Sequence, residues 1–359
     1  MGTEDGVVRA RADLAEQHRR LRELEGRDVD RRVDALAERL DSLTSAVERM
    51  LDRMDALEQR RATDPAVEAA VRAASTDAVN ALQRTDVLQR ILLREHERNT
   101  GAGDGTTTPV LCDAGLLRLP ADDSFMLPWL SSNPTWDADT SALIDSLLEP
   151  DGIFLDIGAY VGYQAVRVLS RLGNSGAVVA VEPCPRSAEL LEHNVGVNVP
   201  AAWAHRLVLL RGAAWDSPCD MTSEASPTGG VSVAPAADGE EASVRGIRLD
   251  KELEGHAALQ DLKLSVVHVD VGAQVHRVLG GLVRLLRRDR PSIVCSFTPA
   301  AITELGDDPA AALREFGTWG YELVPVGRTR PVSASDLLEA INAAESASTV
   351  KLWLRPKQK

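Results

Sequence analysis

One stretch, residues 153–162, constrains the fold of this chain more than any other. It opens with an apolar run, passes through Asp156 and enters a turn that contains Gly158 and Gly162. An apolar helical pattern follows at once. The positions that set this pattern are Val166, Leu169 and Leu172. The stretch therefore predicts a strand, a tight loop and a helix start, with glycines that let the backbone approach a ligand closely.

The glycine spacing separates this loop from dinucleotide-binding loops. A dinucleotide site has the pattern G-x-G-x-x-G, whereas this loop has an aspartate and two glycines in the order Asp-x-Gly-x-x-x-Gly. A nicotinamide oxidoreductase is therefore excluded. An ordinary turn between a strand and a helix stays the alternative, because loose glycine motifs recur by chance.

Two more acids stand at the ends of apolar runs. Glu182 ends the run 177–182, and Asp270 ends the run 264–270. Ligands of open α/β sheets bind beyond the carboxyl ends of the strands. Glu182 follows the glycine loop by about 20 residues, a spacing that suits a carboxylate accepting ribose hydroxyls. The alternative for Glu182 is a cap on the turn that Pro183 favours.

Apolar runs alternate with helical patterns from residue 109 to the end of the chain. This alternation predicts an α/β fold with a Rossmann-like, doubly wound and mostly parallel sheet. Residues 322–326 and 350–354 are expected to form a final antiparallel pair, and 216–243 a surface insertion with a hairpin. The predicted strands are 110–112, 116–119, 153–157, 177–182, 207–210, 264–270 and 292–297.

Composition narrows the class of partner. The net charge of −14 disfavours nucleic acid and anionic membranes, since both need clustered basic residues. The cysteines are scattered, as in a reduced, cytoplasmic protein. They are Cys112, Cys184, Cys219 and Cys295. The acidic N-terminus has no apolar core of a signal peptide, and no apolar run is long enough to span a bilayer.

Residues 1–98 differ from the rest of the chain, being rich in Ala, Leu, Arg, Glu and Asp. They contain a seam of apolar residues that recur at alternating intervals of three and four positions. This spacing predicts a long α-helical coiled coil and a parallel homodimer. The alternative is a helix that packs on its own chain. The seam residues are Val33, Leu36, Leu40, Leu43, Val47, Met50, Met54 and Leu57. Residues 99–108 have the composition of a flexible linker, so 109–359 is expected to be a separate domain.

The motifs from residue 110 to 354 resemble the FkbM-type methyltransferase family. They run from Phe154–Tyr163 through Val181–Pro185 to Gly317–Tyr321. Between these lie the weaker matches Glu192–Asn194, Asn198, Gly212–Asp216, Gly246–Asp250 and Val269–Val271. The resemblance implies a Rossmann-like sheet, S-adenosylmethionine as the cofactor, and O-methylation of a sugar, glycan or natural product.

The resemblance also implies roles for individual residues. Glu182 would bind the ribose, Asp216 would lie near the adenine, and Asp270 would face the methyl group and the acceptor. The glycine loop would shape the rest of the cofactor site. Its residues are Asp156, Gly158, Ala159, Tyr160 and Gly162.

The acceptor side departs from the family pattern. The family continues Asp-Val with Glu-Gly-Ala-Glu, but here Val271 is followed by Gly272, Ala273, Gln274 and Val275. The segment holds no replacement for these glutamates. Two functions stay open: an active O-methyltransferase, or a non-catalytic scaffold of the same fold that recruits partners through its coiled coil.

His268 is a second candidate for catalysis on the acceptor side. It lies two residues before Asp270 and therefore shares its sheet face. Its imidazole suits a general base, since its pKa lies near neutrality. A hydrogen-bonded structural histidine is the alternative, as is a metal site with Asp270 and His276.

The coiled-coil seam gives a first prediction. Replacing both Leu40 and Leu43 by Asp puts charges into the seam, so the dimer should dissociate into monomers that still bind the cofactor. Light scattering of the full chain measures this change. A wild-type chain that is monomeric at micromolar concentration would show that the helix packs on its own chain.

Overall fold

The computed structural model describes residues 106–357 apart from 173–175, 226–230, 255, 257–258, 260–261, 272–273 and 344–348. The predicted coiled coil and most of the predicted linker lie outside the described residues. The linker prediction is corrected at its end, because strand β1 (Thr107–Cys112) already begins at Thr107. Its register with β2 (Gly115–Pro120) pairs Thr107 with Pro120, so these residues are held by a ladder.

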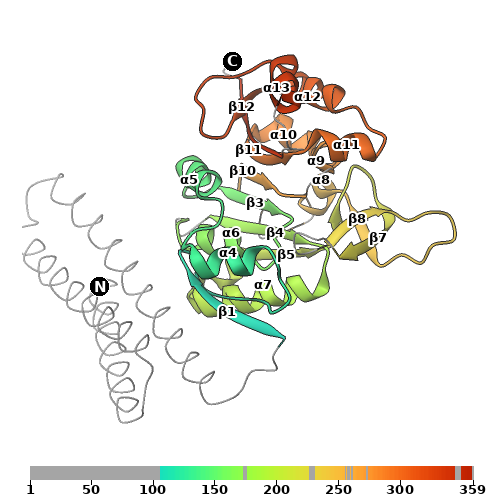
Figure 1. The fold of residues 1–359 in the computed structure, drawn as a ribbon. Coiled ribbons are helices and arrows are strands. Elements are labelled where there is room, and N and C mark those ends of the chain that lie inside the picture. Colours follow the sequence, from blue (N-terminus) through green and yellow to red (C-terminus); the bar gives the residue numbers. More distant parts are fainter. Residues whose placement is uncertain are drawn as a thin grey trace, which may run out of the picture. The chain divides into compact units, whose positions relative to one another are not determined.

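A seven-stranded sheet forms the centre of the described part of the chain, in the order β12-β13-β11-β10-β3-β4-β5 (Figure 1). Five strands are parallel, and β13 runs antiparallel to both β11 and β12. This arrangement confirms the predicted mostly parallel sheet and its final antiparallel pair. The strands are β3 (Ile153–Ile157), β4 (Ala177–Glu182), β5 (Leu207–Arg211), β10 (Leu264–Val269), β11 (Ser292–Phe297), β12 (Tyr321–Pro325) and β13 (Val350–Pro356).

Helices cover both faces of this sheet, as its continuous apolar strands require. Successive side chains alternate between the faces; Leu155 and Val179 belong to one core cluster, and Phe154 and Val178 to the other. The second cluster packs against α4 (Met126–Ser132), α5 (Ala138–Leu147), α6 (Tyr163–Leu169) and α7 (Pro185–Asn198). The first cluster packs against elements that include α8 (Leu249–Glu252), α9 (Val275–Gly280), α10 (Val283–Asp289), α11 (Pro299–Glu304), α12 (Pro309–Thr318) and α13 (Ala334–Ala343).

The predicted surface insertion, 216–243, supplies the two outer strands of a second, small sheet with the order β6-β9-β7-β8, whose other two strands flank the insertion in sequence. Its outer part is an antiparallel hairpin, as expected. The strands are β6 (Ala213–Ala214), β7 (Cys219–Ala225), β8 (Val231–Pro235) and β9 (Val244–Ile247). A short helix, η1 (Ala201–Arg206), precedes β5. All four cysteines are free, as expected. Among the described helices, none has the length and apolar character needed to cross a membrane.

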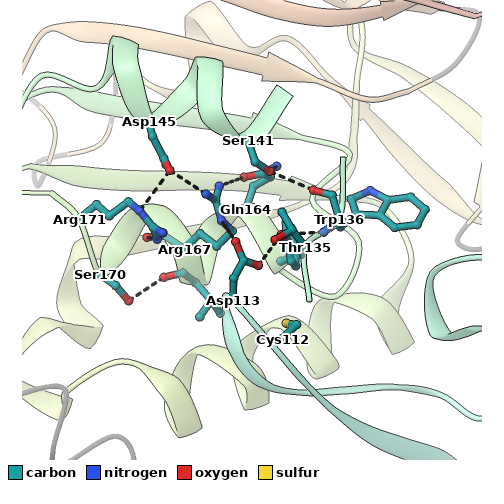
Figure 2. A network of polar contacts seen from close by, with 12 residues as sticks. Cys112, Asp113, Thr135, Trp136, Ser141, Asp145, Gln164, Arg167, Ser170 and Arg171 are labelled. Carbon is teal, nitrogen blue, oxygen red and sulfur yellow. Dashed lines mark hydrogen bonds and ion pairs between the residues drawn. The ribbon is translucent and has the colours of Figure 1, made fainter. Parts of the chain in front are cut away.

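A buried arginine joins the first hairpin and α5 to α6 (Figure 2). Arg167 is 3% exposed and donates to Asp113 in the β1–β2 turn at 3.0 Å and to Asp145 of α5 at 2.7 Å. Tyr163 donates to the second oxygen of Asp113 at 2.6 Å. Because α6 directly follows the glycine loop, this network fixes the β1–β2 turn and α5 relative to the helix that begins at the end of that loop.

This network gives a second prediction. Arg167→Met removes the cation that Asp113 and Asp145 share, although Asp145 keeps Arg171 at 3.4 Å. Breaking a fully buried pair costs about 3–5 kcal/mol, and we expect a loss at or below the lower end of that range because both acids are partly exposed. The matched control is Arg211→Met, because Arg211 pairs with Glu192 at the surface, where ion pairs contribute about 0–1 kcal/mol. Urea unfolding measures both. Equal free energies of unfolding for the two variants would contradict the role of Arg167.

Candidate functional site

At Gly158 and Gly162 the backbone of the glycine loop has a positive φ angle, and a side chain at either position would clash with neighbouring atoms. Gly158 has φ +80° after strand β3, and a Cβ there would lie 2.5 Å from the backbone oxygen of Asp270. Gly162 has φ +86° at the start of α6, where a Cβ would lie 2.7 Å from Leu191 Cγ. The N–H groups of Gly158 and Ala159 both donate to the Val181 carbonyl, at 3.0 and 3.2 Å. The loop is therefore closely packed between the ends of β4 and β10.

Glu182 lies at the end of β4, where backbone N–H groups bind both of its carboxylate oxygens. Tyr160 N donates to Oε2 at 2.8 Å and Cys184 N donates to Oε1 at 2.9 Å. The residue is 4% exposed. Burial raises the pKa of Glu182 to about 7, with a smaller contribution from Asp156, against the lowering effect of the two N–H bonds. The carboxyl group is thus fixed in place and titrates near neutral pH.

Asp156 and His268 form a buried pair on neighbouring strands. The two residues are partners in the register of β3 and β10, and Asp156 Oδ1 lies 2.8 Å from His268 Nδ1. Because a carboxylate only accepts hydrogen bonds, Nδ1 of His268 carries the proton of this contact. Asp156 Oδ2 is also buried, and it has no hydrogen-bond partner among the described residues. A buried acceptor of this kind costs about 1–3 kcal/mol until a donor reaches it, which marks a place for a ligand group.

Asp270 lies beyond the end of β10 in a second polar group. Ser296 donates to Asp270 Oδ1 at 2.5 Å, and Lys351 Nζ lies 3.3 Å from Oδ2. Lys351 also reaches Asp137, the N-cap residue of α5, at 3.2 Å. The side chain of Asp270 is 38% exposed, so the loss of hydration raises its pKa little, and Lys351, His268 and Ser296 together hold that pKa below its usual value. Burial would lower the pKa of Lys351, yet Asp270 and Asp137 raise it, so both groups are ionised at neutral pH.

The structure brings together most of the predicted site residues. Asp156, Glu182, His268 and Asp270 all lie at the carboxyl ends of adjacent strands, next to the glycine loop. Asp216 is different, because it pairs with Arg277 of α9 at 3.2 Å and accepts a hydrogen bond from Ser217. No contact joins Asp216 to these three acids or to His268 among the described residues, so its predicted place near the adenine stays a prediction.

Several residues of the site were not predicted from the sequence. These residues are Lys351, Asp137 and Asp123, which come from distant segments; Asp123 accepts a hydrogen bond from the hydroxyl of the predicted Tyr160 at 3.0 Å. The sequence feature that could have pointed to Lys351 is its place as a charged residue inside the apolar run 350–354. The conceivable metal site is not supported, because His276 pairs with Asp307 instead and the described residues contain no group of three potential metal ligands.

Comparison with protein families gives one match. Residues 156–323 match the model of the methyltransferase FkbM domain. The matched range begins at Asp156 and includes Glu182, His268 and Asp270. The match confirms the predicted FkbM resemblance over this range. No curated protein sequence matches the chain.

Solved methyltransferase structures show a loose likeness. A methyltransferase FkbM from Methylobacillus flagellatus is 12% identical, with 86% of this chain and 60% of that chain covered and a TM-score of 0.37. The Aeropyrum pernix fibrillarin with natively bound S-adenosyl-L-methionine is 15% identical, with 59% and 72% covered and a TM-score of 0.33. Scores this low assign no function by themselves.

The raised pKa of Glu182 gives a third prediction. Ribose hydroxyls donate best to the ionised carboxylate, so S-adenosylhomocysteine should bind about tenfold more tightly at pH about 8 than at pH about 6. Calorimetry measures this difference. Glu182→Gln is the matched control and should lack this contribution, since the amide does not ionise. A wild-type affinity that does not change with pH would contradict the assignment.

The same shift has an effect on stability with a defined sign. Between pH about 4.5 and about 7 the folded state keeps a proton on Glu182 that the unfolded state has lost. The contribution of Glu182 to stability is therefore full below this window and declines as the pH rises through it. Glu182→Gln should not show this decline, which urea unfolding across the window would measure.

Proposed function

We propose that residues 109–359 form an S-adenosylmethionine-dependent O-methyltransferase that acts on a hydroxyl of a sugar, glycan or natural product. The family match supports methyl transfer. The observation that carries the cofactor assignment is the unpartnered Asp156 Oδ2 next to the fixed carboxyl group of Glu182. Both groups stand at the end of the sheet where ligands of α/β folds bind.

The residues present fit this cofactor. Each Glu182 oxygen has used one lone pair on a backbone N–H and keeps another for a ribose hydroxyl. Asp156 Oδ2 can accept from a second donor of the cofactor, and Gly158 and Gly162 present only backbone to it. When bound, S-adenosylmethionine supplies a methyl group on a cationic sulfur, which an oxygen nucleophile can attack in line. The acids of the site favour such a cation.

Asp270 is the residue that we assign to the acceptor. Its side chain is 38% exposed and ionised, so it can accept a hydrogen bond from the acceptor hydroxyl and orient that oxygen. With the cofactor bound, Asp270 would take the hydroxyl proton as the acceptor oxygen receives the methyl group, and would then release that proton to water. Most of the rate enhancement would come from this alignment.

His268 has a supporting role in this proposal. It is buried, and its Nδ1 is bound to Asp156, so it holds Asp156 Oδ2 in the orientation that meets the cofactor. The general-base role for His268 is therefore less favoured than the structural alternative.

The surroundings of Asp270 favour an enzyme over a non-catalytic scaffold. The family glutamates are missing after Val271, but Ser296 and Lys351 fix both oxygens of Asp270. A carboxylate kept ionised and partly open to solvent is a group prepared for a ligand. Assembly through the coiled coil stays part of the proposal as a homodimer that tethers two such domains.

The assignment of Asp270 gives a fourth prediction. Asp270→Asn should lower kcat by about 10²–10⁴-fold, the range for a lost proton acceptor, while the affinity for S-adenosylhomocysteine stays the same. Lys351→Met should move the acid limb of the kcat profile to higher pH, because the pKa of Asp270 rises without the cation. Methyl transfer to a panel of hydroxyl acceptors measures both effects.

Two outcomes would contradict this proposal in different ways. A wild-type chain that does not bind S-adenosylhomocysteine would remove the cofactor assignment. A chain that binds it but transfers no methyl group to any hydroxyl acceptor would favour the scaffold.

A further inference from the structure

Three aromatic side chains gather on the surface around α4. Phe125 and Trp129 are 48% and 49% exposed, which is unusual for side chains of this size. Both pack edge-on against Trp136, with ring centroids 5.2 and 6.2 Å apart. These three residues are called the aromatic platform below. An exposed apolar cluster of this kind commonly marks a binding site.

The segment that carries the platform is fixed to the candidate site at its first end. Asp123 accepts the Tyr160 hydroxyl at 3.0 Å, and Tyr160 is the loop residue whose N–H binds Glu182. The same Asp123 accepts the backbone N–H groups of Phe125 and Met126, at 2.7 and 2.8 Å. The position of Phe125 is therefore tied to the cofactor loop.

The segment is also fixed to the site at its other end. Trp136 is followed directly by Asp137, which binds Lys351, and Lys351 in turn binds Asp270. Successive Cα atoms are about 3.8 Å apart, so Trp136 lies close to the acceptor side. The segment that carries the platform is thus linked to the cofactor loop at one end and, through Lys351, to Asp270 at the other.

The platform is held in place before any ligand binds. Trp129 donates its Nε1–H to the Thr135 carbonyl at 3.0 Å. The backbone of Trp136 is held on both sides, by the Tyr163 hydroxyl at 2.9 Å and by the Ser141 hydroxyl at 3.0 Å. Figure 2 shows the Trp136 ring turned away from the polar network around Arg167. Rigid aromatic rings bind with little loss of conformational entropy.

The charges nearby restrict what the platform can bind. The acids at or near its ends are Asp122, Asp123, Asp137, Asp139 and Asp270, and the cations in contact with them are Arg186 and Lys351. An anionic ligand would be repelled here. The apolar face of an uncharged ring fits aromatic side chains without this penalty.

We propose that Phe125, Trp129 and Trp136 bind the acceptor of the methyl transfer by the apolar face of an uncharged ring, which places its hydroxyl at Asp270. The inference rests on the proposed function, since it names the acceptor class of the same site. Sugar rings and the rings of aromatic natural products share this chemistry. The experiment therefore tests both sources.

The test begins with binding to the full chain labelled with 5-fluorotryptophan. The fluorine signals of Trp129 and Trp136 are assigned with Trp129→Phe and Trp136→Phe. The probes are methyl glucoside for a sugar face, catechol for an aromatic ring, and phenyl glucoside with phenyl glucuronide as a neutral and anionic pair. At millimolar concentration a neutral ring should shift the Trp129 and Trp136 signals, and the glucuronide should shift them less.

Turnover then separates recognition from chemistry. With a ring-bearing acceptor, Phe125→Leu and Trp129→Leu should each raise KM roughly tenfold, the value of one good ring contact, and leave the affinity for S-adenosylhomocysteine unchanged. The matched control is Leu305→Ala, because Leu305 is 45% exposed and no contact ties it to Tyr160 or Lys351 among the described residues.

Each contrary result has one meaning. If no neutral ring shifts the two signals, or if the glucuronide shifts them as much as the neutral glucoside does, the inference is overturned. Signals that change with protein concentration instead of with probe would mark a contact between copies, which also overturns it. If the variants of an active enzyme keep the wild-type KM, the acceptor-binding role of the platform is wrong but the proposed function stands. If the wild-type chain does not bind S-adenosylhomocysteine, the proposed function itself is wrong.

Discussion

A carboxyl group buried at the end of an apolar sheet needs hydrogen-bond donors, and the arrangement of this site depends on that need. Glu182 obtains its donors from the backbone of Tyr160 and Cys184. The N–H group of Tyr160 reaches Glu182 because the loop turns sharply, with φ +49° at Tyr160 and φ +80° at Gly158. Asp156 obtains one donor from His268 and has none for its second oxygen. The donors thus shape the loop, and the oxygen of Asp156 that has no donor among the described residues is the atom on which the proposed cofactor assignment rests.

The central sheet and the glycine loop of the candidate site could be predicted from the sequence because their signals are local. Apolar runs such as 177–182 and 264–270 became strands β4 and β10 almost at their predicted bounds. Residues two apart on such strands share a face, which brings His268 and Asp270 to one side of the sheet. The glycine loop before α6 was predicted from spacing alone.

The acceptor half could not be predicted, because its contacts join distant segments. Lys351 reaches Asp270 only because β13 returns antiparallel beside β11, and no local pattern gives that strand order. Asp137 and the aromatic platform are placed by tertiary contacts with Lys351 and Tyr160. Asp216 follows a short strand of the second sheet and meets Arg277, a pairing that its motif did not indicate.

A structure with S-adenosylhomocysteine bound would test the central claim most directly. The account predicts both ribose hydroxyls within hydrogen-bond distance of Glu182, a donor of the cofactor on Asp156 Oδ2, and the sulfur facing Asp270. A nucleoside bound elsewhere, with Glu182 contacting only Tyr160 and Cys184, would contradict it.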